Sequence, residues 1–309
     1  MPLIRSVAEV YDSDPTKNTE RRIGSFLMLS AFQINVITSA MFMTAMAANP
    51  LIAELAGESG VQISWSDWLL AALLPGLASL ILIPLFVYKF YGPEIKETPA
   101  ARELAQEKLH EMGPITPGEW ITGGVIVLLL VLWVGGQAWS INATTAAFVG
   151  LAVLLITGVL TWQDMLNEKG AWDTIVWFAA LVMMASQLNA LGFVPWFGET
   201  VAQKVSGLEW TTAFLILALV YFYSHYLFAS QTAHISAMYA PFLAIALTVG
   251  APPVLAALVL AFFSNLFSSL THYANGPAPV VFGTGYVSMG AWWGMGAVVS
   301  VINIVIWVG

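Results

Sequence analysis

Long apolar stretches recur along the chain, and short polar or charged segments separate them. A stretch of about 20 apolar residues is long enough to cross a bilayer as a helix. Membrane-spanning helices are therefore predicted at 24–50, 66–91, 120–139, 144–161, 174–192, 211–229, 233–250, 252–268 and 287–308. This pattern predicts an all-α polytopic membrane protein.

Several of these spans are interrupted by residues that disfavour a lipid-facing helix. The first is broken at Thr38–Ser39 and again at Asn49–Pro50, and the chain between 268 and 287 is rich in Pro, Gly and polar residues. Irregular backbone at membrane depth must face protein or water, because lipid offers its polar groups no hydrogen bonds. Broken helices of this kind point to the binding site of a transporter. Residues 162–173, in contrast, are predicted as a short polar loop.

The distribution of Lys and Arg predicts the orientation in the membrane. The segments 1–23 and 89–119 contain four Lys or Arg residues each, whereas 51–65 and 140–143 contain none. Cytoplasmic loops are enriched in these residues, so we expect the first two segments, and Lys169, on the cytoplasmic side. The middle of the second segment has the charge density of an exposed helix.

The composition excludes several functional classes. Of 309 residues, 59% are hydrophobic and 9% are charged, with a net charge of −8, whereas soluble domains carry about a quarter charged residues. Soluble enzymes and nucleic-acid-binding proteins are therefore excluded, and the lack of Cys excludes a disulfide framework. Residues 210–309 contain no Asp, Glu, Lys or Arg, which argues against a cation pump. The chain has no HExxH or GxSxG motif, so we do not expect an enzyme.

Hydroxyl and amide side chains cluster in three short segments, at 38–50, 224–234 and 271–279. A helix that begins inside the membrane presents free N–H groups and the positive end of its dipole to a small anion. Such a segment can hold a carboxylate without Arg. Alternatively, Ser and Thr bond back to their own helix or join helices. We assign this structural alternative to the isolated Ser79 and Ser264, and anion binding to the clustered side chains.

Three histidines lie in apolar surroundings, whereas His110 lies in a charged loop. Ionisable groups within a membrane are costly and usually functional, although neutral hydrogen-bonded histidines also occur there. For His225 both interpretations stay open. For His234 and His272 we favour a functional role, because either protonated ring would place positive charge near a bound dianion.

Three phrases of the sequence, ITSAMFMTAMAANPL, SHYLFASQTAHISAMYAPFLA and LTHYANGPAPVVFGTGYV, are similar to the divalent anion:sodium symporter family. The closest resemblance is to its branch of citrate, tartrate and 2-oxoglutarate/malate carriers, and it runs over the whole chain. It implies an inverted-repeat transporter, in which each repeat has a re-entrant hairpin and a discontinuous helix. The signature of the first repeat is expected upstream of Met1, so the chain resembles the C-terminal two-thirds of a carrier.

The resemblance also implies how the chain is divided. Residues 1–50 correspond to the end of the first repeat with its discontinuous helix, and 51–119 to a transmembrane helix and a cytoplasmic polar loop. Residues 120–173 correspond to scaffold helices of the second repeat, and 174–309 to its substrate-binding region. We expect a homodimer for the full-length protein. The expected location is the lipid bilayer of a bacterial inner membrane, or the chloroplast inner envelope if the protein is eukaryotic.

The resemblance implies a site for di- or tricarboxylate anions. Its second-repeat signature corresponds to Ser230–Gln231–Thr232, with Gln in place of the usual Asn. The expected substrate-binding residues are Ser230, Gln231, Thr232, His234, Thr271, His272, Asn275, Gly276, Pro277, Ser39, Thr44 and Asn49. No cofactor or resident metal is expected, apart from Na⁺ near Ser230, Gln231 and Asn275 if transport is sodium-coupled.

The predicted function is secondary transport of these anions by alternating access. The exchanger branch of the family has a basic residue two positions after the signature Thr, and His234 occupies that position. Our hypothesis is that its charge replaces one sodium ion, which favours exchange of dicarboxylates. Sodium-coupled symport and a truncated, non-transporting membrane protein are the alternatives. The sequence does not choose between malate, succinate, tartrate, 2-oxoglutarate and citrate.

Overall fold

The computed structural model describes residues 2–169, 208–228 and 230–308, together with isolated positions between 172 and 200. Within these ranges every regular element is helical, which confirms the predicted all-α class. The α-helices are α1 (Pro2–Val10), α2 (Gly24–Met41), α3 (Asn49–Glu58), α4 (Trp65–Tyr91), α5 (Pro99–Met112), α6 (Pro117–Trp139), α7 (Ala143–Ile156), α8 (Trp162–Asn167), α11 (Trp210–Ser224), α12 (Gln231–Thr248), α13 (Pro253–Leu266), α14 (Pro277–Phe282) and α15 (Met289–Val308). Three short 3₁₀ turns are η1 (Pro15–Lys17), η2 (His225–Leu227) and η3 (Phe267–Ser269). The span predicted at 174–192 lies largely outside the described residues.

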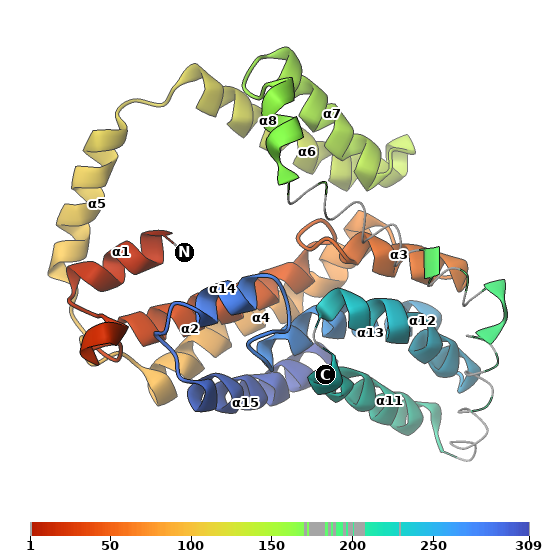
Figure 1. Cartoon of the computed structure of the whole chain (residues 1–309). Helices are drawn as coiled ribbons and strands as arrows, with labels where there is room; N and C mark the ends of the chain where they lie inside the picture. Colours follow the sequence, from red (N-terminus) through yellow and green to blue (C-terminus); the bar gives the residue numbers. More distant parts are fainter. Residues whose placement is uncertain are drawn as a thin grey trace.

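The helices form one main bundle and one smaller group (Figure 1). In the bundle, α2 packs against α4 and α13, and α15 packs against α4. The smaller group contains α6 and α7, which pack against each other, and α6 also contacts α4. In the sequence, α5 lies between α4 of the main bundle and α6 of the smaller group. The buried core of the bundle is a large apolar and aromatic cluster, with polar side chains such as Asn49, Gln231, His234 and Asn265 also buried.

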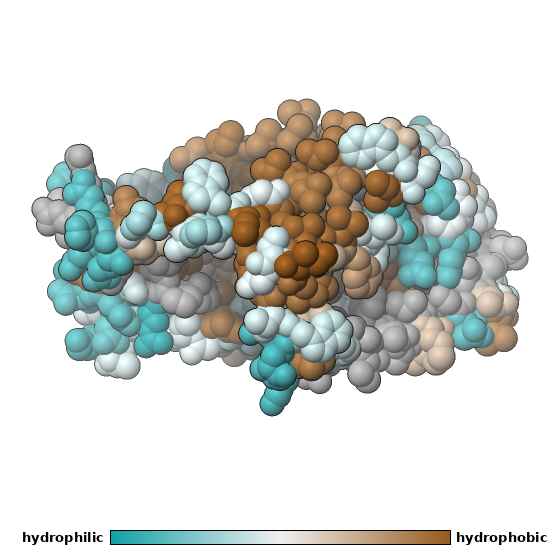
Figure 2. Space-filling view, turned by 90° about the horizontal axis from the view of Figure 1, so that it is seen from above, coloured by the Kyte–Doolittle hydropathy of each residue, from teal (hydrophilic) through white to brown (hydrophobic). Residues whose placement is uncertain are grey.

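The surface is that of a membrane-spanning protein. Within the described residues, α2, α4, α15, residues 117–136 of α6 and residues 210–227 are long and apolar enough to cross a membrane. Figure 2 shows a hydrophobic band across the middle of one face, with hydrophilic residues towards both ends. Large apolar side chains on the outer faces of α4 and α6 are exposed, as expected for residues that contact lipid rather than water.

Local capping explains where two of the helices begin. Ser64 and Asp67 form a reciprocal capping box at the start of α4, in which each side chain bonds the backbone N–H of the other. The same arrangement of Thr161 and Asp164 starts α8. Because such a box satisfies two otherwise unpaired N–H groups, the segment 162–173 contains a short helix, and its prediction as a loop is wrong there.

Both discontinuous helices are present, and the first is interrupted at only one of its two predicted points. Thr38 and Ser39 remain in α2, because their hydroxyls bond back to the Asn35 carbonyl at 3.1 and 2.8 Å. The first break therefore spans residues 42–48, and α3 begins at Asn49. Because α3 continues beyond residue 50, the domain boundary predicted there falls inside a helix. The second break spans residues 270–276, between η3 and α14.

The two isolated serines have structural roles, as predicted. The Ser79 hydroxyl donates to Asn303 Oδ1 at 3.2 Å and accepts from Trp307 Nε1 at 2.9 Å, which joins α4 to α15. The Ser264 hydroxyl bonds back to the Leu260 carbonyl at 2.7 Å and lies 2.7 Å from the Tyr221 hydroxyl. All these atoms are buried, so the bonds satisfy groups that lipid would leave unpaired.

Candidate functional site

The elements α11, η2 and α12 form a helical hairpin, whose tip we define as residues 225–230. The chain turns there because Ser230 takes an extended backbone conformation and caps α12. Its hydroxyl accepts from the N–H of Ala233 at 3.5 Å. The amino-terminal end of α12, which is the positive end of its helix dipole, therefore lies at the tip. A hairpin with the second signature at its tip is the arrangement that the family resemblance implies.

The beginning of α12 and the tip are fastened to the second break. The backbone N–H of Gln231 donates to the Ala274 carbonyl at 2.7 Å. The side-chain amide of Gln231 donates to the Ser264 carbonyl at 2.6 Å. The Tyr273 hydroxyl donates to the Tyr226 carbonyl at 3.3 Å. Backbone and side-chain bonds together hold the hairpin against α13 and the break that follows it.

The first break is closed by one buried side chain. Asn49 Nδ2 donates to the carbonyls of Ser39 and Phe42 at 3.0 and 3.1 Å, which satisfies two carbonyls near the end of α2. The side-chain oxygen of Asn49, Oδ1, accepts a hydrogen bond from Asn265 Nδ2 at 2.8 Å. A side chain at the start of α3 thus bonds to α2 and α13 at once. Because all these groups are removed from water, their pairing is needed for the break to be stable.

A cavity of about 540 Å³ lies between the two breaks and the hairpin. The described residues that line it are Asn35, Ser39, Ala45, Met46, Ala47, Ser230, Gln231, Thr232, Tyr273, Ala274, Asn275, Gly276, Pro277 and Pro279. None of these side chains carries a formal charge, and hydroxyl and amide groups alternate with small apolar ones. The positive end of the α12 dipole is the main electrostatic feature among them. A small anion suits such a neutral, donor-rich cavity.

Seven of the twelve predicted substrate-binding residues line this cavity, and five do not. The seven are Ser39, Ser230, Gln231, Thr232, Asn275, Gly276 and Pro277. Thr44 instead accepts from Trp65 Nε1 at 3.3 Å, and Asn49 closes the first break. Thr271 is fully buried. The remaining two, His234 and His272, bond to neighbouring side chains.

The histidines lie behind the cavity rather than on its surface. His234 is fully buried, its Nε2 is 2.8 Å from the Ser224 hydroxyl, and its ring contacts Tyr221, Phe228 and Phe267. His272 accepts from Trp293 Nε1 at 3.1 Å. Neither ring is among the described residues that line the cavity.

His225, for which both interpretations were open, is also fully buried. Its ring stacks on Phe267 at 4.0 Å between centroids. The ring of His234 lies 5.6 Å away and is nearly perpendicular to it. The contacts of His225 are thus packing contacts with η3 and with the ring of His234 in α12.

Sequence reasoning missed two polar residues of the cavity, Asn35 and Tyr273. Asn35 lies about one turn before Ser39 in α2. That spacing was a usable signal, because residues four apart share one face of a helix. Tyr273 lies inside a segment that was already singled out, and its position became clear only from the path of the break.

Comparison with known proteins places the whole chain, residues 1–309, within a family model described as the sodium:sulfate symporter transmembrane region. A provisionally named malate transporter of Bacillus subtilis is 57% identical over 99% of the chain and 64% of its own length. Dicarboxylate transporter 1 of the Spinacia oleracea chloroplast is 51% identical over 100% of the chain and 55% of its own length. The L-tartrate/succinate antiporter of Shigella sonnei is 34% identical over 99% of the chain and 63% of its own length. The chain thus spans between about half and two-thirds of these relatives.

Proposed function

Because the chain belongs to the sodium:sulfate symporter transmembrane family, we propose that it binds di- or tricarboxylate anions and carries them across a membrane by exchange. The observation that carries this proposal is the neutral, donor-rich cavity between the two helix breaks and the hairpin. The names of the relatives, which refer to malate, dicarboxylates, and tartrate with succinate, support the substrate class.

Each end of a dicarboxylate has its own group of donors in the proposal. One carboxylate lies at the start of α12, near Ser230 and Thr232, where the helix dipole stabilises negative charge. The other lies near Ser39 and Asn35 on α2, across the cavity. Cavities of several hundred Å³ hold small organic ligands. Removing one donor to a charged ligand costs on the order of 1–3 kcal/mol, or about fivefold to 150-fold in affinity.

The arrangement of the helices supports an alternating-access movement. The cavity is built entirely from the main bundle, which contacts the α6–α7 group chiefly through α4 and α6. At that junction Trp65 stacks on Trp133 at 5.9 Å, and the Ser66 hydroxyl donates to the Val134 carbonyl at 3.1 Å. A second cavity of about 400 Å³ lies there. We propose that the bundle moves as a unit against the α6–α7 group.

Exchange is preferred over sodium coupling because of His234. Its backbone N–H bonds to the Ser230 carbonyl at 3.0 Å, so its ring lies one turn behind the start of α12. When a dianion occupies the cavity, its negative charge offsets the cost of charging this buried ring, and the protonated ring then adds positive charge behind the anion site without touching the substrate.

Sodium symport is the second candidate, and one observation favours it. Ser230, Ala274 and Asn275 all line the cavity, and the last two belong to the unwound second break. Oxygen atoms from an unwound segment of this kind fit a sodium ion, because broken membrane helices coordinate sodium through freed carbonyls.

The test is counterflow in proteoliposomes. Vesicles loaded with unlabelled succinate are exposed to labelled malate, 2-oxoglutarate or citrate, with and without sodium. We expect sodium-independent uptake that requires internal dicarboxylate. Thr232→Val should raise the substrate concentration for half-maximal uptake by about tenfold. Thr248→Val, at the exposed far end of the same helix, should leave that concentration unchanged.

Three outcomes of this experiment would contradict the proposal. Uptake driven by a sodium gradient without internal substrate would favour symport. If uptake is sodium-independent but His234→Ala leaves strict exchange intact, the role given to His234 is wrong. No uptake by folded protein would favour the non-transporting alternative.

A further inference from the structure

A basic pocket lies at the end of α4 that the distribution of Lys and Arg assigns to the cytoplasm. It has a volume of about 410 Å³ and is lined by Arg21, Tyr88, Lys89, Phe90, Gly92, Pro93 and Lys96. None of these residues lines the cavity of the candidate functional site. The pocket therefore needs an explanation of its own.

Three of the ten Lys and Arg residues of the chain meet in this pocket. Among the described residues, no carboxylate forms an ion pair with Arg21, Lys89 or Lys96. The neighbouring linker carries Glu94 and Glu97, yet neither approaches these cations within ion-pair distance. Three cations thus share one concave site without a carboxylate to balance their charge.

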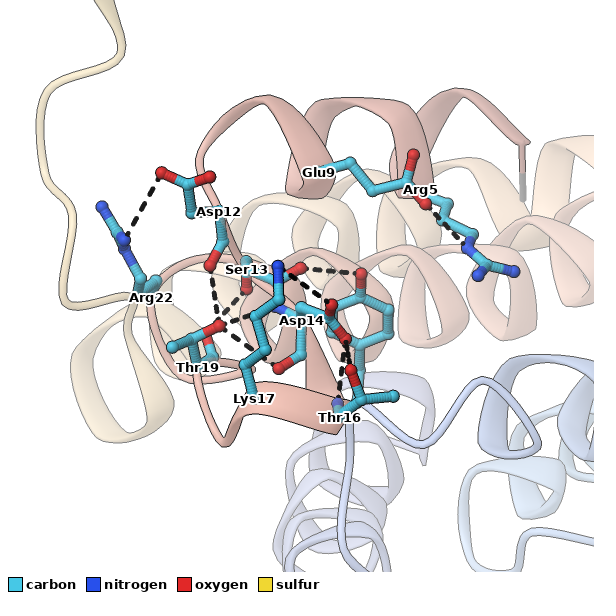
Figure 3. A network of polar contacts seen from close by, with 10 residues as sticks. Arg5, Glu9, Asp12, Ser13, Asp14, Thr16, Lys17, Thr19 and Arg22 are labelled. Carbon is cyan, nitrogen blue, oxygen red and sulfur yellow. Dashed lines mark hydrogen bonds and ion pairs between the residues drawn. The ribbon is translucent and has the colours of Figure 1, made fainter.

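The other cations of the amino-terminal segment do have partners (Figure 3). The ion pairs are Arg5 with Glu9 at 3.0 Å, Lys17 with Asp14 at 3.7 Å, and Arg22 with Asp12 at 3.8 Å. Among the described residues at this end of the molecule, the cations without a carboxylate partner are therefore those of the pocket.

Backbone hydrogen bonds fix the position of Arg21 in the pocket. The N–H groups of Glu94 and Ile95 donate to the carbonyls of Arg21 and Arg22 at 3.2 and 3.0 Å. The Arg21 guanidinium donates to the Gly92 carbonyl at 3.3 Å and lies 3.8 Å from the centre of the Tyr91 ring. These contacts organise the cation before any ligand arrives, which lowers the entropic cost of binding.

Gly92 is needed for this geometry. A Cβ atom at that position would collide with the backbone carbonyl oxygen of Tyr88. The absence of a side chain lets the chain leave α4 close to the helix end. The wall of the pocket that Arg21 contacts is thus bare backbone.

An apolar stripe runs from the pocket along the outer face of α4. Ile81 and Leu85 are 62% and 59% exposed, and they share one helix face with Tyr88 and Lys89 because residues at spacings of four, seven and eight are aligned. In a membrane this face contacts acyl chains. A lipid whose headgroup occupies the pocket would place its acyl chains along the stripe.

We infer that this pocket binds the phosphate headgroup of an anionic phospholipid in the cytoplasmic leaflet. Basic pockets at this depth suit such headgroups, because the leaflet is rich in anionic lipid and each cation adds to the attraction. The lipid would hold the amino-terminal segment, α4 and the linker to α5 together. The inference does not depend on the proposed transport function.

The test is native mass spectrometry of the purified protein in detergent, titrated with phosphatidylglycerol or phosphatidylcholine. We expect phosphatidylglycerol to be retained preferentially. Each removed cation should weaken its binding about fivefold, so Arg21→Gln/Lys89→Gln/Lys96→Gln should weaken it roughly a hundredfold. The matched control, Arg5→Gln/Lys17→Gln/Arg22→Gln, removes the same charge from paired residues and should leave binding nearly unchanged.

A second variant keeps the test decisive if loss of Arg21 disturbs folding. Lys89→Gln/Lys96→Gln leaves the Arg21 contacts intact and should weaken binding about 25-fold. Equal loss in the control variant, or equal retention of phosphatidylcholine, would overturn the inference. Displacement of the lipid by inorganic phosphate or glycerol 3-phosphate at similar concentration would also overturn it, because the pocket would then be a site for a soluble anion.

Discussion

The two helix breaks that line the cavity are closed in different ways. In the first break, the Asn49 side chain satisfies the carbonyls of Ser39 and Phe42 within its own helix pair. In the second break, the Ala274 carbonyl and the Tyr273 hydroxyl bond to residues of the hairpin. The first break is therefore closed by one residue beside it, whereas the second depends on a separate element.

This difference indicates which parts of the site can move independently. The hairpin cannot leave the second break without giving up at least two hydrogen bonds. The bonds from Asn49 to the Ser39 and Phe42 carbonyls, in contrast, do not involve the hairpin. The hairpin and the first break are nevertheless linked through α13, because Asn265 bonds to Asn49 and the Ser264 carbonyl accepts from Gln231. We infer that α13 is the fixed reference against which the hairpin is positioned.

The largest effect is expected from removing the side chain that closes the first break. Asn49→Ala deletes two N–H hydrogen bonds to carbonyls and removes the Asn49 acceptor of the buried Asn265 amide, which keeps only its bond to the Ala261 carbonyl. The loss should cost about 3 kcal/mol of stability. Thermal unfolding in detergent measures this loss. The control is Asn35→Ala, since Asn35 is exposed in the cavity and should affect substrate affinity while leaving the unfolding temperature nearly unchanged. Equal destabilisation by the two variants would show that Asn49 has no special role.

The next effect concerns the bond between the hairpin and α13. Gln231→Ala removes the donor to the buried Ser264 carbonyl and should cost about 1–2 kcal/mol, while the backbone bond to Ala274 remains. We expect faster hydrogen exchange at the start of α12 than in the unmodified protein. Exchange in α3 should stay the same, because the first break is closed without the hairpin. Coupled changes in both regions would contradict the proposed independence.

A smaller effect is expected at the second contact of the hairpin. Tyr273→Phe removes the hydroxyl that donates to the Tyr226 carbonyl at 3.3 Å. Its loss should cost about 0.5–1 kcal/mol, because the bond is long and only partly buried. Combining it with Gln231→Ala should give a non-additive loss, since both bonds hold the same hairpin. Strict additivity in unfolding experiments would indicate that the two contacts act separately.

The sequence predicted most of the spans because apolar length is a strong signal. The spans predicted at 66–91 and 287–308 correspond to α4 and α15 within about two residues. The interruption predicted at Thr38–Ser39 was wrong because both hydroxyls bond to their own helix and so do not interrupt it, whereas the one predicted at Asn49–Pro50 coincides with the start of α3. Hydroxyl groups in an apolar run are compatible with a continuous helix or with a break, and only the path of the backbone distinguishes the two.

The candidate site was predicted as segments rather than as individual side chains. All three polar segments contribute to the cavity, yet the sequence did not reveal which face of each segment points inwards. His234 lies one turn after Ser230, and at that spacing its ring enters the hairpin instead of the cavity. Thr44 and Asn49 are on the correct loop, but bonds to Trp65 and Asn265 turn them away.

The smallest effect is expected outside both breaks, and it concerns acid stability. The described lining of the cavity includes no carboxylate, so protonation near pH 4 should leave the breaks unchanged. At the amino-terminal segment, the Thr16 hydroxyl and backbone N–H both donate to Asp14, and Lys17 lies nearby. These contacts lower the pKa of Asp14 below its ordinary value of 3.8.

A carboxylate whose pKa is lower in the folded protein stabilises the fold above its unfolded pKa, and this contribution is lost as the pH falls through the folded pKa. Asp14→Asn should therefore slightly lower the unfolding temperature at neutral pH, and stability should fall less steeply below about pH 4 than in the unmodified protein. Hydrogen exchange followed over the same pH range distinguishes the regions: the change should appear around η1 and the start of α2, with α3 and the hairpin unaffected. An acid-induced change that begins at either break would contradict this, because it would require a titrating group that the cavity lining does not contain.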